Sequence, residues 1–129
     1  VTDTGDRVTN PATKNVWYNI SQLNISVPIG CWDMEMILAL YGSTTSGSSA
    51  TKGTLSTANN SEINKLYTVQ LWVLNSTGCY GCLTNRFPLL TTSKTQYYTN
   101  VCNDQNNPSE IGILSSGKTS VVRAVCAYL

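Results

Sequence analysis

Asp33 and Glu35 are the acidic pair whose spacing comes closest to a catalytic arrangement. Residues two apart in a strand lie on the same face, about 7 Å from each other, and glycosidases use paired carboxylates at comparable separations. Two acids on one open strand face are far more typical of a solvated surface or of a salt bridge at an interface. The chain contains no histidine, which excludes Ser-His-Asp and Cys-His nucleophile systems. We therefore predict that the chain is not an enzyme.

The five cysteines could support a second kind of chemistry, metal binding or disulfide formation. Cys79 and Cys82 have the spacing of half a zinc site, but Cys31, Cys102 and Cys126 are scattered singly. With no histidine to complete a ligand set, we predict no metal and no cofactor. Because the number of cysteines is odd, at least one thiol stays unpaired within the chain. We expect most of them to be free, behaving as small apolar side chains, with one or two disulfides as the alternative.

Polar but uncharged side chains dominate the composition. The chain has 17 Thr, 14 Ser and 13 Asn among 129 residues, whereas charged residues make up 12% and the net charge is +1. The eight Lys and Arg are spread singly along the chain, without the cationic cluster that nucleic acid binding requires. No apolar run reaches the length of a membrane span. We therefore expect neither a nucleic acid partner nor membrane insertion, and the 41% of hydrophobic residues predicts a folded core.

Alternation of apolar and polar residues predicts the strands that position these groups. The clearest patterns are at residues 23–27, 31–41 and 67–74. A helix would also accommodate residues 34–41, but the flanking glycines and neighbouring strands favour a strand. Weaker strands are expected at 79–84, 96–102 and 110–114, and a final strand at 120–129 is apolar on both faces. The Ser-, Thr- and Gly-rich residues 42–60 predict a long exposed loop with at most a short edge strand, and residues 103–108 predict a turn.

About eight strands separated by turns predict an all-β fold, an antiparallel β-sandwich or a barrel. We find no repeat and no convincing helix. Because the last strand is apolar on both faces, we expect it to lie inside the structure and against a neighbouring subunit. Trp32 shares a face with Met34 and Met36 and is assigned to the core. Trp72 faces away from the apolar side of its strand and could lie in a subunit interface.

Two segments resemble elements of viral and bacteriophage fibre proteins. Residues 17–34 begin with Trp-Tyr-Asn-Ile-Ser and continue through a Pro-x-Gly-x-Trp turn, similar to an element that joins two jelly-roll strands in those proteins. Lys118–Val125 resembles the closing strand of the same domains. Cys31 and Met34 depart from the commoner residues of the turn, and the middle of the chain matches no motif of the family.

This resemblance implies a jelly-roll-like β-sandwich that forms a compact homotrimer, similar in architecture to the complement and tumour-necrosis-factor heads. Residues 1–14 would be a shaft end or linker, and residues 15–129 the head at the fibre tip on the virion surface. Such a head would bind a host cell-surface receptor, either a glycan or a protein, without catalysis. The alternative is a secreted bacterial adhesin or lectin domain that binds host glycans, which predicts a disulfide and a monomer.

Loops on a rigid sandwich are the usual place for recognition, here residues 42–60, 79–86 and 94–107. Tyrosine rings suit the apolar face of a sugar, and a cationic side chain could pair with the carboxylate of a sialic acid. The candidate receptor-binding residues are therefore Tyr80, Arg86, Lys94, Tyr97 and Tyr98. If the strand around 96–102 is regular, either Tyr97 or Tyr98 must face inward.

Overall fold

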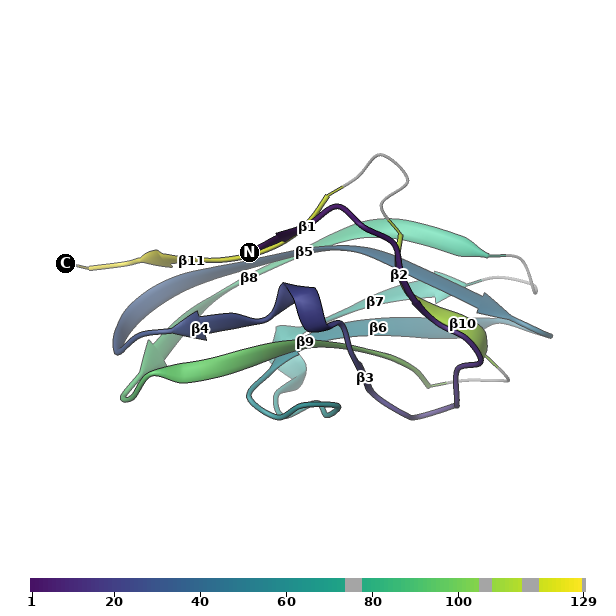
Figure 1. The fold of residues 1–129 in the computed structure, drawn as a ribbon, viewed down its shortest axis with the longest axis horizontal. Helices are drawn as coiled ribbons and strands as arrows, with labels where there is room; N and C mark the ends of the chain where they lie inside the picture. Colours follow the sequence, from purple (N-terminus) through teal and green to yellow (C-terminus); the bar gives the residue numbers. More distant parts are fainter. Residues whose placement is uncertain (74–77, 105–107, 115–118, 129) are drawn as a thin grey trace.

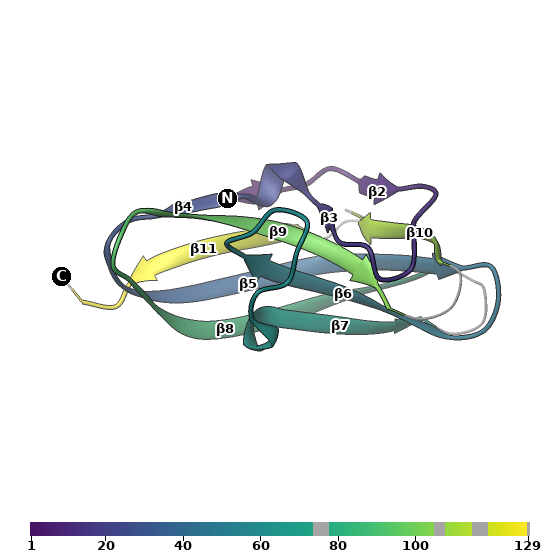
Figure 2. The same cartoon turned by 90° about the horizontal axis from the view of Figure 1, so that it is seen from below.

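The computed structural model describes residues 1–73, 78–104, 108–114 and 119–128. Within these residues the chain forms eleven strands and two short 3-10 turns, and the strands make two antiparallel sheets packed face to face. Figures 1 and 2 show the two layers from perpendicular directions. The predicted all-β sandwich is confirmed. None of the described residues form a helix long and apolar enough to cross a membrane.

Sheet A is organised around β5, the longest strand. On one edge β5 pairs with β8 along nearly its whole length, and on the other edge it pairs first with β11 and then with β10. The short strands β1 and β2 extend the sheet beyond β11 and β10. The bounds are β1 (Thr2–Asp3), β2 (Arg7–Thr9), β5 (Gly30–Thr44), β8 (Cys79–Thr91), β10 (Pro108–Ile113) and β11 (Ser120–Cys126).

Sheet B has β9 and β6 at its centre. These two strands pair with each other. The other edge of β6 pairs with β7, and the other edge of β9 pairs with β3 and then with β4. The bounds are β3 (Tyr18–Asn19), β4 (Ile25–Val27), β6 (Ser49–Ser56), β7 (Thr68–Val73) and β9 (Thr95–Asn103), with 3-10 turns η1 (Ser21–Leu23) and η2 (Lys65–Tyr67). The strand predicted at 23–27 corresponds to β4, which begins two residues later, at Ile25, because Leu23 belongs to η1.

The eleven strands occupy only eight strand positions in the two sheets, because some short strands lie end to end at one position. β10 and β11 lie one after the other along one edge of β5, β1 and β2 lie along those two strands, and β3 and β4 lie along β9. Each sheet thus has four strand positions, and the total of eight agrees with the number of strands expected from the sequence.

The core lies between the two sheets and follows from alternation. In β5 the even-numbered residues face inward, so that Met34, Met36, Leu38 and Leu40 are almost completely buried. At one side of the sandwich, the rings of Tyr67 and Phe87 stack with centroids 4.0 Å apart. Trp32 also packs against this core, as predicted. The other fully buried large side chains are Leu23, Val27, Leu55, Val73, Val101, Ile111, Ile113 and Val122.

The expected loop at residues 42–60 is wrong over most of its length, because β5 continues to Thr44 and β6 is a central strand of sheet B. Ser49, Thr51 and Thr54 of β6 have no exposed surface. Their hydroxyl groups form hydrogen bonds inside the fold; for example, the Asn103 amide donates to the Ser49 hydroxyl at 2.9 Å. Polar residues on both faces hide the alternation that normally marks a strand. The sequence pattern therefore resembled a loop.

β8 is also longer than expected, since the predicted strand at 79–84 continues to Thr91. The proposed recognition loop at 79–86 is thus part of a strand, and most of the one at 94–107 is β9. Pro88 interrupts the sequence pattern of β8. It is tolerated because β8 is an edge strand of sheet A, where a missing N–H group need not pair.

The turn that carries the resemblance, Pro28 to Trp32, joins β4 to β5. The Trp32 indole N–H donates to the Pro28 carbonyl at 3.0 Å, and the Thr91 hydroxyl donates to the same oxygen. Gly30 has φ of +141°, a conformation that residues with a Cβ rarely adopt. The sequence expectation of a turn at this point is confirmed.

The two ends of the described chain lie in sheet A. Residues 1–14 contribute β1 and β2 to it, and the Ala12 amide donates to the Ser109 carbonyl at 3.1 Å. A connection of these residues to a shaft stays a prediction. β11 lies between β1 and β5, which places it inside the sheet. Residues 105–107 of the predicted turn at 103–108 lie outside the described residues.

Candidate functional site

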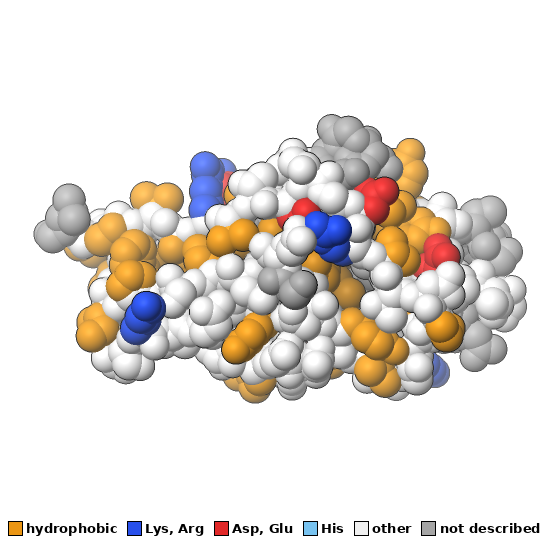
Figure 3. All heavy atoms as spheres, viewed as in Figure 1, with side chains coloured by type: hydrophobic (Ala, Val, Ile, Leu, Met, Phe, Trp, Pro, Cys, Tyr) orange, Lys and Arg blue, Asp and Glu red, His pale blue; other side chains and the backbone are white. Residues whose placement is uncertain are grey.

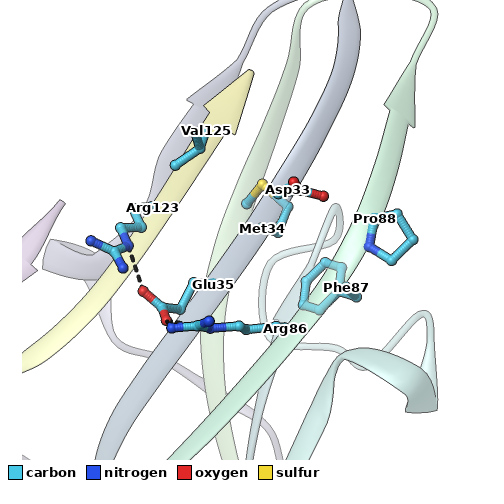
Figure 4. Close-up of a pocket in the computed structure, with 8 residues that line it drawn as sticks. All are labelled: Asp33, Met34, Glu35, Arg86, Phe87, Pro88, Arg123 and Val125. Carbon is cyan, nitrogen blue, oxygen red and sulfur yellow. Dashed lines mark hydrogen bonds and ion pairs between the residues drawn. The ribbon is translucent and has the colours of Figure 1, made fainter. Parts of the chain in front are cut away.

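The outer surface of sheet A is the candidate functional site. Odd-numbered residues of β5 point outward, together with Arg86, Pro88 and Leu90 of β8 and Val121, Arg123 and Val125 of β11. We call the part formed by Cys31–Ile37, Thr84–Leu90 and Val121–Val125 the β11–β5–β8 face. Figure 4 shows its central part, with side chains from all three strands.

Glu35 occupies the centre of this face between two arginines (Figure 4). The Arg86 Nε–H donates to Glu35 Oε1 at 2.5 Å, and the Arg123 guanidinium pairs with Glu35 Oε2. Arg86 of β8 and Arg123 of β11 reach Glu35 because each is directly opposite Glu35 in the strand register. Glu35 is only 5% exposed, whereas both arginine side chains are mostly open to solvent.

The ion pairs control the protonation of Glu35. Burial alone would raise the pKa of the carboxyl, but hydrogen bonds and charges from Arg86 and Arg123 outweigh burial and hold the pKa below its ordinary value of 4.5. A general acid in a glycosidase needs the opposite shift. Glu35 therefore has the properties of a salt-bridge residue rather than those of a general acid.

Asp33 lies two residues earlier on the same face and differs from Glu35. It is exposed, and its carboxylate has no hydrogen-bond or ion-pair partner among the residues that the structure describes. It lines an open hollow of about 420 Å³ together with Glu35, Arg86 and Arg123. The hollow thus brings a free carboxylate close to two guanidinium groups that share one counter-ion.

Apolar side chains surround this charged centre. Leu90 is 70% exposed and Val125 55% exposed. Pro88 and Asp33 also line a second hollow of about 530 Å³, which continues to Leu90 and Tyr128. In Figure 3 hydrophobic side chains gather at the end of the molecule where β11 and the C-terminus lie in Figure 1. The β11–β5–β8 face therefore combines exposed apolar surface with a compact set of charges.

The five predicted receptor-binding residues do not form one site. Tyr80 is exposed on β8 beyond the β11–β5–β8 face, and Arg86 is within that face. Lys94 is exposed in the connection between β8 and β9. Tyr97 is 5% exposed and belongs to the core, while Tyr98 is half-buried on the outer side of sheet B. One of the two adjacent tyrosines faces inward, as the alternation predicted. Receptor contact by these residues stays a prediction.

The cysteines are all free thiols. Cys79 and Cys82 are three apart in β8 and therefore point to opposite sides of sheet A, so their spacing does not make a paired site. Burial raises the pKa of the Cys102 thiol to about 11, which leaves it uncharged and unreactive near neutral pH. Within the described parts of the chain, no three Cys, Asp or Glu side chains form a group that could hold a metal ion.

Sequence reasoning missed Arg123 as a partner of Glu35. Side chains alternate between the two sides of a strand, so the sequence of each strand predicts which side Glu35 or Arg123 points to. It does not contain the register that places residue 123 opposite residue 35. Glu35 itself was expected in a solvated face or in a salt bridge at an interface; the structure shows a salt bridge, but its partners are two arginines of the same chain.

We compared the chain with family models, curated proteins and solved structures, and none of the three comparisons found a match.

Proposed function

We propose that the domain is the receptor-binding head of a trimeric viral or phage fibre, which attaches the virion to a host cell surface without catalysis. The observation that carries this proposal is the pairing of the two segments that resemble fibre proteins. These segments are far apart in sequence, yet Asp33 and Met34 of the first pair in register with Val125 and Ala124 of the second. The resemblance therefore concerns two neighbouring strands of one sheet rather than two unrelated fragments.

The strand arrangement supports the finer part of the fold proposal, a jelly roll. The eight strand positions, four in each of two antiparallel sheets, match the strand number of jelly-roll domains. The polar, weakly charged composition also suits a domain that functions outside the cell on a virion surface. Affinity would come from several heads binding one surface at the same time, so that each single contact can be weak.

Exposed groups outside the β11–β5–β8 face are the candidates for receptor contact. Tyr80 is 60% exposed, and its ring could stack on a sugar or pack against a protein side chain. Lys94 is exposed in a connection between strands. Arg86 is engaged with Glu35, and Tyr97 is in the core; we therefore place receptor binding at Tyr80, Lys94 and the loops near them.

The first test is the molar mass of the purified domain, measured by light scattering under reducing conditions. The proposal predicts three times the chain mass of 14.0 kDa. A monomer at every concentration contradicts the trimer and favours a single-domain adhesin. That alternative also predicts a disulfide, for which the structure offers no cysteine pair.

The second test is attachment. The fluorescently labelled trimer is incubated with intact bacteria and with cultured animal cells, and bound fluorescence is measured by flow cytometry. We expect saturable binding to one of these classes, reduced by Tyr80→Ala together with Lys94→Ala. Pretreatment of the cells with sialidase or with protease separates a glycan receptor from a protein receptor. The absence of saturable binding to both classes by a folded trimer contradicts the proposed function.

A further inference from the structure

We infer that the β11–β5–β8 face is the surface on which a second copy of this chain packs. This inference rests on the proposed trimer and adds the position and chemistry of its subunit contact. It commits to a copy of the same chain as the occupant, for two independent reasons: the apolar content of the face and the arrangement of its charges.

The first reason is the contrast between the outer surfaces of the two sheets. The solvated outer side of an antiparallel sheet normally carries polar residues, and sheet B has Lys52, Thr68 and Gln70 in such positions, with Trp72 as an exposed apolar residue beside them. On the β11–β5–β8 face the outward residues include exposed Leu90, Val125, Pro88 and Cys31 and half-buried Ile37 and Val121. Exposed apolar side chains gathered on the outer side of a sheet in this way mark an interaction site.

The second reason is charge. Arg86, Arg123, Glu35 and Asp33 together carry a formal charge of zero, so the face does not offer the excess positive charge that a polyanion or an acidic lipid surface requires. It does offer both signs: the Asp33 carboxylate is free, and the two guanidiniums have N–H groups open to solvent. A subunit that carries the same set can supply what is missing, Asp33 of one copy to an arginine of the next. In a trimer the same face of all three copies meets only around the three-fold axis, so this pairing places the β11–β5–β8 face at that axis.

The shape of the face agrees with a protein partner. The two hollows share Asp33 and Pro88 as lining residues and therefore form one continuous depression along β5 and β8. Its lining includes Pro88, Val125 and Leu90, which are exposed in the single chain and would be buried only if something covers the depression. Side chains such as Leu90 from a neighbouring copy have the chemistry to do so.

The test uses two variants within the face and two outside it. Leu90→Arg and Val125→Glu place opposite charges on the apolar surface, so that a loss common to both reports on the buried contact rather than on the sign of the charge. Ile63→Arg is the matched control, because Ile63 is 63% exposed but lies in the loop before η2. Trp72→Arg tests the rival face, since Trp72 is exposed on the outer side of sheet B.

We expect the first two variants to fall to the mass of one chain with an unchanged far-UV circular dichroism spectrum, while Ile63→Arg and Trp72→Arg keep the mass of the wild type. If the wild type is trimeric and both Leu90→Arg and Val125→Glu stay trimeric, the inference is wrong and the proposed function stands. Dissociation by Trp72→Arg alone would assign the contact to sheet B. A wild type that is monomeric at every concentration contradicts the inference together with the proposed trimer.

Thiol protection gives a measurement that needs no variant. Cys31 lies within the face, whereas Cys82 is exposed on the same strand pair outside it. In the assembled wild type we expect iodoacetamide to modify Cys82 and to leave Cys31 unmodified. In Leu90→Arg, both thiols should react. Equal modification of Cys31 in the assembled protein and in that variant would overturn the inference.

Discussion

At the scale of the residue, Glu35 keeps its charge although its side chain is almost completely covered. Its two arginine partners supply the stabilisation that water would otherwise give, and they keep the pKa of the carboxyl below 4.5 despite burial. A carboxyl with a lowered pKa in the folded protein binds protons more weakly when folded than when unfolded. It therefore stabilises the fold at pH values above its unfolded pKa.

This stabilisation should be lost as the pH falls below about 4.5 and through the lower pKa of the folded state. We expect Glu35→Gln to reduce the free energy of unfolding at about pH 7, because Arg86 and Arg123 lose their counter-ion. Toward about pH 3 the difference between wild type and variant should shrink. Urea unfolding at both pH values measures this difference, and a difference that does not depend on pH would contradict the role of Glu35.

Cys102 is the thiol with the most distinctive environment. It is 3% exposed, and burial raises its pKa to about 11. Alkylation requires the thiolate, so iodoacetamide at about pH 8 should leave Cys102 unmodified and react with exposed Cys82. Peptide mass spectrometry identifies the modified residues, and the same reaction in urea should modify all five cysteines. Modification of Cys102 in the folded protein at the rate of Cys82 would show that this part of sheet B opens readily.

At the scale of the element, alternation predicted the strands that have one apolar face and failed for β6. The patterns at 31–41, 67–74 and 110–114 correspond to β5, β7 and β10. β6 is polar on both faces, and it is held by pairing with β7 and β9 and by hydrogen bonds of its hydroxyl groups. Such contacts depend on residues distant in sequence. Local propensity therefore could not identify this strand.

Gly112 shows how closely two elements approach in sheet A. A Cβ atom at this position would lie 1.9 Å from the Arg7 carbonyl oxygen and 2.9 Å from the Val8 Cα. Because these atoms belong to the backbone of β2, they cannot move away without loss of the β10–β2 pairing. We expect Gly112→Ala to lower the free energy of unfolding by about 1–3 kcal/mol.

The matched control is Gly5→Ala, whose Cβ would meet only the end of the Arg7 side chain at 3.0 Å. A flexible side chain can move, so the expected change is below about 0.5 kcal/mol. Urea unfolding of both variants compares the two positions. A Gly112→Ala variant as stable as Gly5→Ala would show that β2 is not held closely against β10.

At the scale of the whole molecule, no disulfide contributes to stability, since all five cysteines are free. We therefore expect the same Tm with and without a reducing agent. A native disulfide would contribute roughly 2–5 kcal/mol, and its reduction would lower the Tm measurably. A drop in Tm on reduction would contradict this architecture and favour the adhesin alternative.

The sequence predicted the fold class from alternation and turn residues, but it did not locate the candidate site, and the trimer stays a prediction. Arg86 was selected as a receptor residue because it is cationic, yet the register of β8 and β11 on β5 determines that it meets Glu35. The β11–β5–β8 face contains residues from three distant segments. Their combination depends on strand order, which no local pattern encodes.

The position of β11 between β1 and β5 has a consequence for biosynthesis. Among the strands that the structure describes, β1 pairs only with β11, and the amino group of Val1 donates to the Val122 carbonyl at 2.7 Å. While the ribosome is still translating residues 120–126, β1 has no partner and one edge of β5 is open for much of its length. We expect stalled nascent chains that expose only residues 1–119 to be protease-sensitive, and chains that expose residue 126 to become resistant. Folding of this domain would thus be completed only after nearly all of it has left the ribosome, and unpaired strand edges would need protection from aggregation until then.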